Sequence, residues 1–178
     1  MIIFSALIAL VHQVGLSLAI GSSTYAVTFY FKSIQDGVMN DTEKDFLHTV
    51  YFILRVGMAL IIVSEIGNLI VTTLSTSFLA YVSLVSVQFK WFLLATIGTN
   101  AFLMHLHKMP MGFGPAIAGG TWYMYLIADT LGYVALPIYI WIALHALFVF
   151  GFWLLLKAVR YYMMPAVPAT PSGAPKTN

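Results

Sequence analysis

The sequence predicts an all-α integral membrane protein with five transmembrane helices in one bundle. Hydrophobic residues make up 61% of the chain and charged residues only 8%, whereas about a quarter of the residues in a soluble domain are charged. The charges are also unevenly placed, since residues 2–31 contain no Asp, Glu, Lys or Arg. About 20 apolar residues are enough to cross a bilayer as a helix, and the chain contains several such runs.

Composition and length exclude several classes of function. With 178 residues, the chain has room for one membrane domain and for no separate soluble catalytic domain. Its net charge of +2 is too small to indicate nucleic-acid binding. The absence of cysteine excludes disulfides, zinc–thiolate sites and covalent c-type haem attachment.

Three apolar runs predict the first three helices, at residues 2–31, 48–73 and 87–107. The first run is expected to be a retained helix and not a cleaved signal peptide. It lacks the basic start of a signal peptide, and it is about twice as long as the apolar region of one. Residues 32–47 form the only strongly polar loop. The hydroxyl-rich stretch 72–77 leads through residues 78–86 into the third helix.

The last apolar run, residues 121–162, is too long for one crossing. Some forty residues of helix measure roughly 60 Å, which is about twice the hydrocarbon thickness of a bilayer. Dividing it into helices at 115–135 and 138–160 gives five spans with the amino terminus outside. Most basic residues then lie at the cytoplasmic side of an inner membrane, as the positive-inside rule requires: Lys32, Lys44, Arg55, Lys108, Lys157 and Arg160.

An alternative layout has four helices plus an interfacial or re-entrant segment at residues 116–129. In either layout residues 1–164 form the transmembrane domain. Residues 165–178 contain four of the seven prolines, and this Pro/Ala-rich tail is predicted to be disordered.

Two intramembrane histidines predict a cofactor site. His12 belongs to a stripe of small residues that should face the bundle interior, and His145 lies at a similar predicted depth on the last helix. Two inward imidazoles on separate helices suit axial ligation of haem b; the alternative is that each hydrogen-bonds a neighbouring helix. The stripe consists of Ser5, Ala9, His12, Ala19, Ser23 and Ala26. With histidines on separate spans, the chain resembles small helical b-type cytochromes, a likeness of architecture that implies haem-dependent electron transfer.

Polar residues in the predicted outer half of the membrane suggest a proton or ion relay. Glu65, Asn100 and Asp129 are the candidates, because ionisable groups inside a membrane are costly and mark functional sites. An equally weighted alternative is that Glu65 pairs with Lys90 and only locks two helices together.

A second candidate metal site lies at the end of the third predicted helix. His105, His107, Met109 and Met111 alternate along the chain and offer imidazole and thioether ligands that suit copper. The four side chains share one side only in an extended backbone. Since the predicted helix includes both histidines, copper is the less favoured reading.

Three functional hypotheses follow from these residues. The first is a haem-binding subunit for electron transfer across or within the membrane. The second is a proton- or ion-coupled carrier. The third is a non-catalytic subunit of a larger membrane complex. The expected partners are the lipid bilayer and either such a complex or further copies of the chain. No catalytic motif selects an enzymatic activity.

Overall fold

The computed structural model describes residues 2–33, 40–75, 77–106, 108–109, 113–132, 134 and 136–163. These residues form helices and no strand, so the all-α class is confirmed for the part of the chain that is described. Three helices are long and apolar enough to cross a membrane, within the ranges Ile2–Phe29, Asp41–Leu74 and Ile138–Tyr162. The helices are α1 (Ile2–Ser33), α2 (Asp41–Ser75), α3 (Phe78–Val82), α4 (Val85–His105), α5 (Gly114–Leu131) and α6 (Ile138–Met163).

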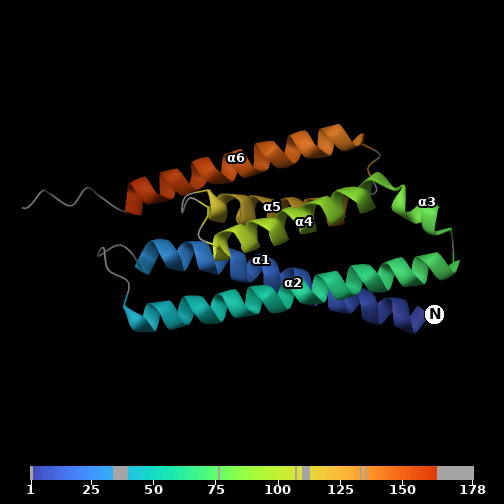
Figure 1. Ribbon diagram of the computed structural model, residues 1–178, viewed down its shortest axis with the longest axis horizontal. Helices are drawn as coiled ribbons and strands as arrows, with labels where there is room; N and C mark the ends of the chain where they lie inside the picture. The colour runs from blue at the N-terminus through green and yellow to red at the C-terminus, as the bar shows by residue number, and fades with distance from the viewer. Residues whose placement is uncertain are drawn as a thin grey trace, which may run out of the picture.

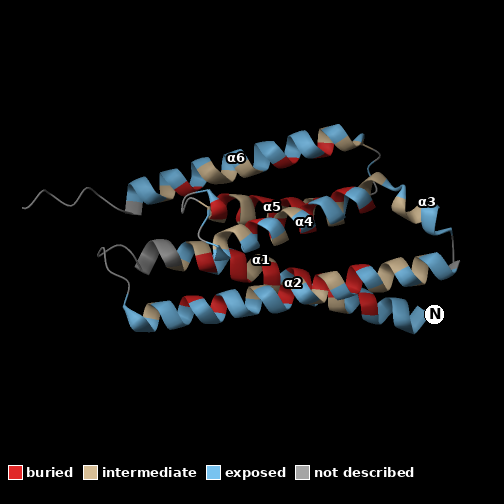
Figure 2. Ribbon diagram, in the orientation of Figure 1, coloured by how far each residue is buried: buried red, intermediate tan, exposed pale blue. Residues whose placement is uncertain are grey.

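Helix α5 occupies the centre of the bundle. Helices α1 and α2 form a long antiparallel pair, α4 and α5 lie beside them, and α6 packs against α5 (Figure 1). Buried residues concentrate on α5 and on the faces that meet it (Figure 2). The core is apolar and rich in aromatic side chains, which include Phe89, Trp122, Tyr125 and Trp141.

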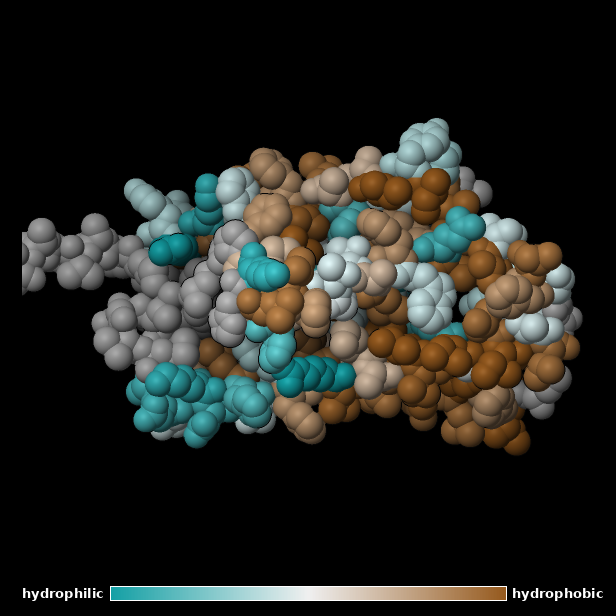
Figure 3. Space-filling model, in the orientation of Figure 1, coloured by the Kyte–Doolittle hydropathy of each residue, from teal (hydrophilic) through white to brown (hydrophobic). Residues whose placement is uncertain are grey.

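Helix α2 begins at Asp41, seven residues before the predicted start at residue 48. The side chains of Asn40 and Glu43 explain the difference. Asn40 Oδ1 accepts from the backbone N–H of Glu43, and Glu43 Oε2 accepts from the backbone N–H of Asn40, each at 2.9 Å. This reciprocal cap starts a helix within a polar segment, where apolarity alone indicates a loop. Hydrophilic side chains gather at this end of the molecule (Figure 3).

The last apolar run is divided between two helices, since α5 ends at Leu131 and α6 begins at Ile138. This division fits both the five-span layout and the alternative with an interfacial or re-entrant segment at residues 116–129. Two other boundaries differ from the prediction. The short helix α3 lies within residues 78–86, and α4 ends at His105 rather than at residue 107. The predicted tail, residues 165–178, lies outside the described residues.

The predicted inward stripe of α1 is correct only in its middle and last turns. His12, Ala19, Ser23 and Ala26 are buried, but Ser5 and Ala9 are exposed. The first turns of α1 extend beyond α4, α5 and α6 (Figure 1), and Ile2 and Ile3 are also exposed. In this part of α1 the side chain that packs inward is Ile8, which lies against Gly67 of α2.

Glycine sets the distance between α1 and α2. A Cβ atom added at Gly57 would lie 2.7 Å from the backbone nitrogen of Ala19 and 2.8 Å from the carbonyl oxygen of Gly15. Both neighbours are backbone atoms of α1 and cannot rotate away. Small residues at such crossings let helices approach closely in an apolar environment.

Replacing Gly57 with alanine should therefore destabilise the fold by about 2 kcal/mol, because the added methyl group forces the two backbones apart. Unfolding in mixed detergent micelles, followed by circular dichroism, measures this cost. Gly151→Ala is the matched control, since a Cβ atom at Gly151 meets nothing within 4 Å. Equal stability of the two variants would contradict this account of the crossing.

Candidate functional site: a buried polar cluster

The chain has six acidic residues, and four of them lie between residues 36 and 45. The other two, Glu65 and Asp129, meet at a single lysine. Lys90 Nζ lies 2.7 Å from Glu65 Oε1 and 3.3 Å from Asp129 Oδ1. These three residues come from α2, α5 and α4, and the α1 residue His12 joins them. The interior therefore brings together charges that are far apart in the sequence.

Two hydroxyl groups complete this cluster. The hydroxyl of Tyr125 donates to Glu65 Oε1 at 2.8 Å, and Ser64 Oγ lies 2.9 Å from His12 Nδ1. His12 Nε2 lies 3.3 Å from Asp129 Oδ1. We refer to the set as the polar cluster; it consists of His12, Ser64, Glu65, Lys90, Tyr125 and Asp129.

The hydrogen bonds determine which nitrogen of His12 carries the proton. The hydroxyl of Ser64 donates to the carbonyl oxygen of Ile61 at 2.7 Å, so it has no second proton to donate. Ser64 Oγ must accept from His12 Nδ1–H, which leaves Nε2 unprotonated in the neutral ring. Nε2 is buried and makes no hydrogen bond among the described residues, although a carboxylate oxygen of Asp129 lies beside it. The cluster thus has a place for one more proton.

The polar cluster is more accessible on one side. The side chains of Lys90 and Asp129 are 16% and 18% exposed, whereas Glu65 is 1% exposed. Tyr81 of α3, which is partly exposed, interacts electrostatically with Glu65 and Lys90. The neighbouring core side chains Trp122 and Phe89 are fully buried among apolar residues. Solvent therefore approaches through Lys90 and Asp129.

The second predicted haem ligand, His145, lies elsewhere in the bundle. Its Nε2 is 3.0 Å from Thr121 Oγ1, and its ring meets Phe92 edge-on with centroids 5.7 Å apart. Thr121 and Asp129, the α5 partners of the two histidines, are eight residues and about 12 Å apart along the helix axis. Axial ligands must reach one iron within about 2 Å. Each histidine here makes its own interhelical contact, and joint haem ligation stays a prediction.

Asn100 is not part of the polar cluster. Its Nδ2 donates to the carbonyl oxygen of Gly114 at 2.9 Å, so it joins α4 to the start of α5. Of the three predicted relay residues, the structure brings Glu65 and Asp129 together and places Asn100 apart. The Glu65–Lys90 pair considered as an alternative is present, but it is one part of a larger network.

The predicted copper ligands can be followed only in part. His105 is the last residue of α4, and Met109 lies in the following segment. His107 and Met111 lie outside the described residues, so the copper site also stays a prediction.

Two residues of the polar cluster, Ser64 and Tyr125, are not among the sites predicted from the sequence. A signal for each was present, since Ser64 precedes Glu65 and Tyr125 lies four residues before Asp129, on the same helix face. No family model, curated protein or solved structure matches this chain. Its function is therefore inferred from its own residues.

Proposed function

We propose that this protein is a proton-coupled carrier that crosses an inner membrane five times, with its amino terminus outside and His12 as its proton-binding residue. The single observation that carries the proposal is the odd charge of the polar cluster. Glu65 and Asp129 contribute two negative charges and Lys90 one positive charge, while His12 is neutral unless it takes up a proton. A proton on His12 Nε2 would balance the charges and pair the ring with Asp129.

The energetics of an apolar environment support this proposal. An unpaired charge inside a membrane is expensive, and buried charges persist when they are paired and hydrogen-bonded. Lys90 and the Tyr125 hydroxyl satisfy Glu65 Oε1, but one negative charge remains without a cation. Of the groups that face His12, Asp129 is the closest acid, and Glu65 Oε1 lies 3.8 Å from Nδ1.

The position of the polar cluster supports a carrier with alternating access. His12 lies near the start of α1, Glu65 near the end of α2, Lys90 near the start of α4 and Asp129 near the end of α5. All four therefore lie toward one end of the antiparallel bundle, which is the outer end in the proposed orientation. Buried apolar residues lie between them and the other end, among them Leu93 and Ile97 on α4 and Trp122 on α5. Protons would enter from outside, and release inside would require this core to open.

Counting bound protons tests the first part of the proposal. In detergent solution, the wild-type protein should take up about one proton more per chain than His12→Gln when the pH is lowered. An indicator dye in weakly buffered solution measures the uptake. If uptake by His12→Gln equals that of the wild type, the proton site is wrong.

Access from the inner side tests the orientation and the carrier class together. The chain contains no cysteine, so a thiol reagent labels only the cysteine that is introduced. A thiol in the tail at Ser172→Cys should react with a membrane-impermeant reagent only from the inner face. Leu94→Cys, which replaces a buried core residue of α4, should react from that face about tenfold faster at acidic pH than at alkaline pH. Labelling of Ser172→Cys from outside would contradict the orientation, and pH-independent protection of Leu94→Cys would contradict alternating access.

A further inference from the structure

His12 has a buried ring nitrogen that faces a carboxylate and makes no hydrogen bond. The side chain is 5% exposed, and its Nε2 lies 3.3 Å from Asp129 Oδ1 but has no hydrogen-bond partner among the described residues. Since Nδ1–H is directed to Ser64 Oγ at 2.9 Å, Nε2 and Oδ1 are both acceptors. Two acceptors this close indicate that a positively charged group belongs with them, and a metal ion meets this need as a proton does.

Three side chains of the polar cluster are spaced for a metal ion. One ligand atom each from His12, Glu65 and Asp129 lies within 4.8 Å of the other two. Zinc bonds of about 2.1 Å in a tetrahedral arrangement separate two donor atoms by about 3.4 Å. The 3.3 Å between His12 Nε2 and Asp129 Oδ1 already matches this separation. A movement of the Glu65 carboxylate by about 1–1.5 Å completes the set.

Lys90 marks the space for the ion. Its Nζ lies 2.7 Å from Glu65 Oε1 and 3.3 Å from Asp129 Oδ1, so a cation already fits between these carboxylates. The lysine is on the more accessible side of the polar cluster, with 16% of its side chain exposed, and its flexible stem allows the ammonium group to move into solvent. The two carboxylates then neutralise one divalent ion in place of the ammonium group and a proton on His12.

The donor set selects the class of ion. Mg²⁺ and Ca²⁺ prefer oxygen ligands alone, whereas imidazole favours divalent transition metals, zinc among them. Zinc also accepts three protein ligands with an open fourth position. The bond from His12 Nδ1–H to Ser64 Oγ orients the ring, as the hydrogen-bond partners of metal-binding histidines generally do.

We infer that His12, Glu65 and Asp129 bind a divalent transition-metal ion such as Zn²⁺, and that this ion is the substrate of the proposed carrier. His12 Nε2 has one lone pair, so it holds either the ion or the proton. Binding therefore displaces the proton and the Lys90 ammonium group together. The role of the ion as substrate rests on the proposed function, whereas its binding depends only on the geometry of the polar cluster.

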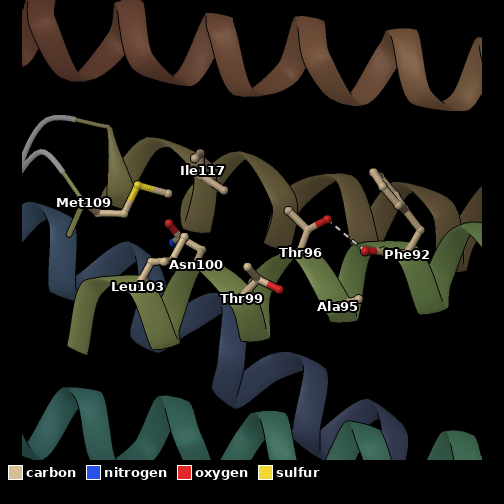
Figure 4. A pocket seen from close by; sticks show the side chains of 8 residues that line it. All are labelled: Phe92, Ala95, Thr96, Thr99, Asn100, Leu103, Met109 and Ile117. Carbon is tan, nitrogen blue, oxygen red and sulfur yellow. Dashed lines mark hydrogen bonds between the residues drawn. The ribbon is translucent and has the colours of Figure 1, made fainter. Parts of the chain in front are cut away.

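The groove between α4 and α5 does not offer an equivalent site. Its lining residues include Thr96, Asn100 and Met109 (Figure 4), and the hydroxyl of Thr96 already donates to the carbonyl oxygen of Phe92 at 2.9 Å. None of its described lining residues is a histidine, an aspartate or a glutamate. Zinc in this groove would have no charged ligand, so the polar cluster is the expected site.

Zinc affinity tests the site. The detergent-solubilised protein competes with a coloured chelator for Zn²⁺ at one fixed neutral pH, and excess Mg²⁺ should not displace the bound zinc. His12→Gln should bind zinc about 100-fold more weakly than the wild type, because even the hydrogen-bond partner of a ligand is worth about 10–100-fold. Asp129→Asn should show the same loss, and it decides if His12→Gln does not fold. His48→Gln is the control, since His48 is exposed on α2 outside the polar cluster, and it should retain the wild-type affinity. Unchanged affinity in a folded His12→Gln or Asp129→Asn protein would overturn the inference.

Lys90→Met separates ion exchange from a merely structural role of the polar cluster. Without an ammonium group to displace, this variant should bind zinc about tenfold more tightly than the wild type, the difference expected for one charged hydrogen bond. Affinity equal to or below that of the wild type would contradict the exchange.

Transport tests the assignment of the substrate. In proteoliposomes that enclose a zinc-sensitive dye, the wild type should admit zinc and Asp129→Asn should not. Binding without entry would overturn the role of zinc as substrate. The proton counts described above keep the two proposals apart. His12-dependent proton uptake without zinc binding would leave the proton site and overturn this inference, whereas His12-dependent zinc binding without a difference in proton uptake would support the metal site and contradict the proton site.

Discussion

Replacing Lys90 with methionine should cost about 3–5 kcal/mol of stability, because it leaves two carboxylates in the interior without their cation. Lys90 Nζ is within 3.3 Å of an oxygen of both Glu65 and Asp129, and methionine fills a similar volume. Unfolding in mixed micelles at neutral pH measures the loss.

The cause of that loss can be separated from poor packing. Combining Lys90→Met with Glu65→Gln and Asp129→Asn removes all the charges at once and should restore most of the stability, since neutral replacement of a whole buried ionic group is often tolerated. Lys157→Met is the control for loss of a lysine at the surface. Lys157 Nζ lies 3.9 Å from the centroid of the Trp153 ring, and its replacement should cost only about 0.5–1 kcal/mol. A Lys90→Met protein as stable as the wild type would show that the ion pairs are not essential to the fold.

His12→Ala and His145→Ala should have different consequences. The first removes the proposed proton-binding nitrogen and should abolish uptake of about one proton per chain. The second removes a hydrogen bond between α5 and α6, so it should cost about 1 kcal/mol and leave proton binding at the polar cluster intact. Proton counts and unfolding curves on both variants measure the two effects.

The same two variants also test the haem hypothesis. Joint ligation predicts that the purified wild-type protein shows a six-coordinate haem spectrum and that either substitution abolishes it. A shared spectral loss would therefore contradict the separate roles derived from the hydrogen bonds. A spectrum without haem absorption after expression with sufficient haem would remove the haem hypothesis.

The fold class and the scarcity of interior charge were predictable because they depend on composition and apolar length. The pairing of Glu65 with Lys90 was also predictable, since few buried cations exist to balance a buried acid. The depth of each histidine along the bundle axis was less predictable. Counting residues from helix ends gives a common depth only when the ends are level, and α1 begins beyond the ends of α4, α5 and α6.

The partners of Asn100 and His12 depend on finer detail. Which way Asn100 faces is determined by the path that carries Gly114 back against α4, and the intervening loop has no periodic pattern from which that path can be deduced. The protonated nitrogen of His12 depends on Ser64, whose own hydroxyl is directed to Ile61 by the local helix geometry. Neither relation has a signature in residue spacing.

The unequal lengths of the helices have a consequence for the surrounding lipid. Helices α1 and α2, with 32 and 35 residues, are about 48 and 52 Å long, whereas α5, with 18 residues, is about 27 Å long. The hydrocarbon layer is about 30 Å thick. In the proposed membrane arrangement, the pair α1 and α2 would therefore exceed the hydrocarbon layer, and α5 would fall slightly short of it. Hydrophobic mismatch of this kind is relieved by tilting or by local thickening, so the hairpin of α1 and α2 should lean in the membrane and draw longer-chain lipids to its side.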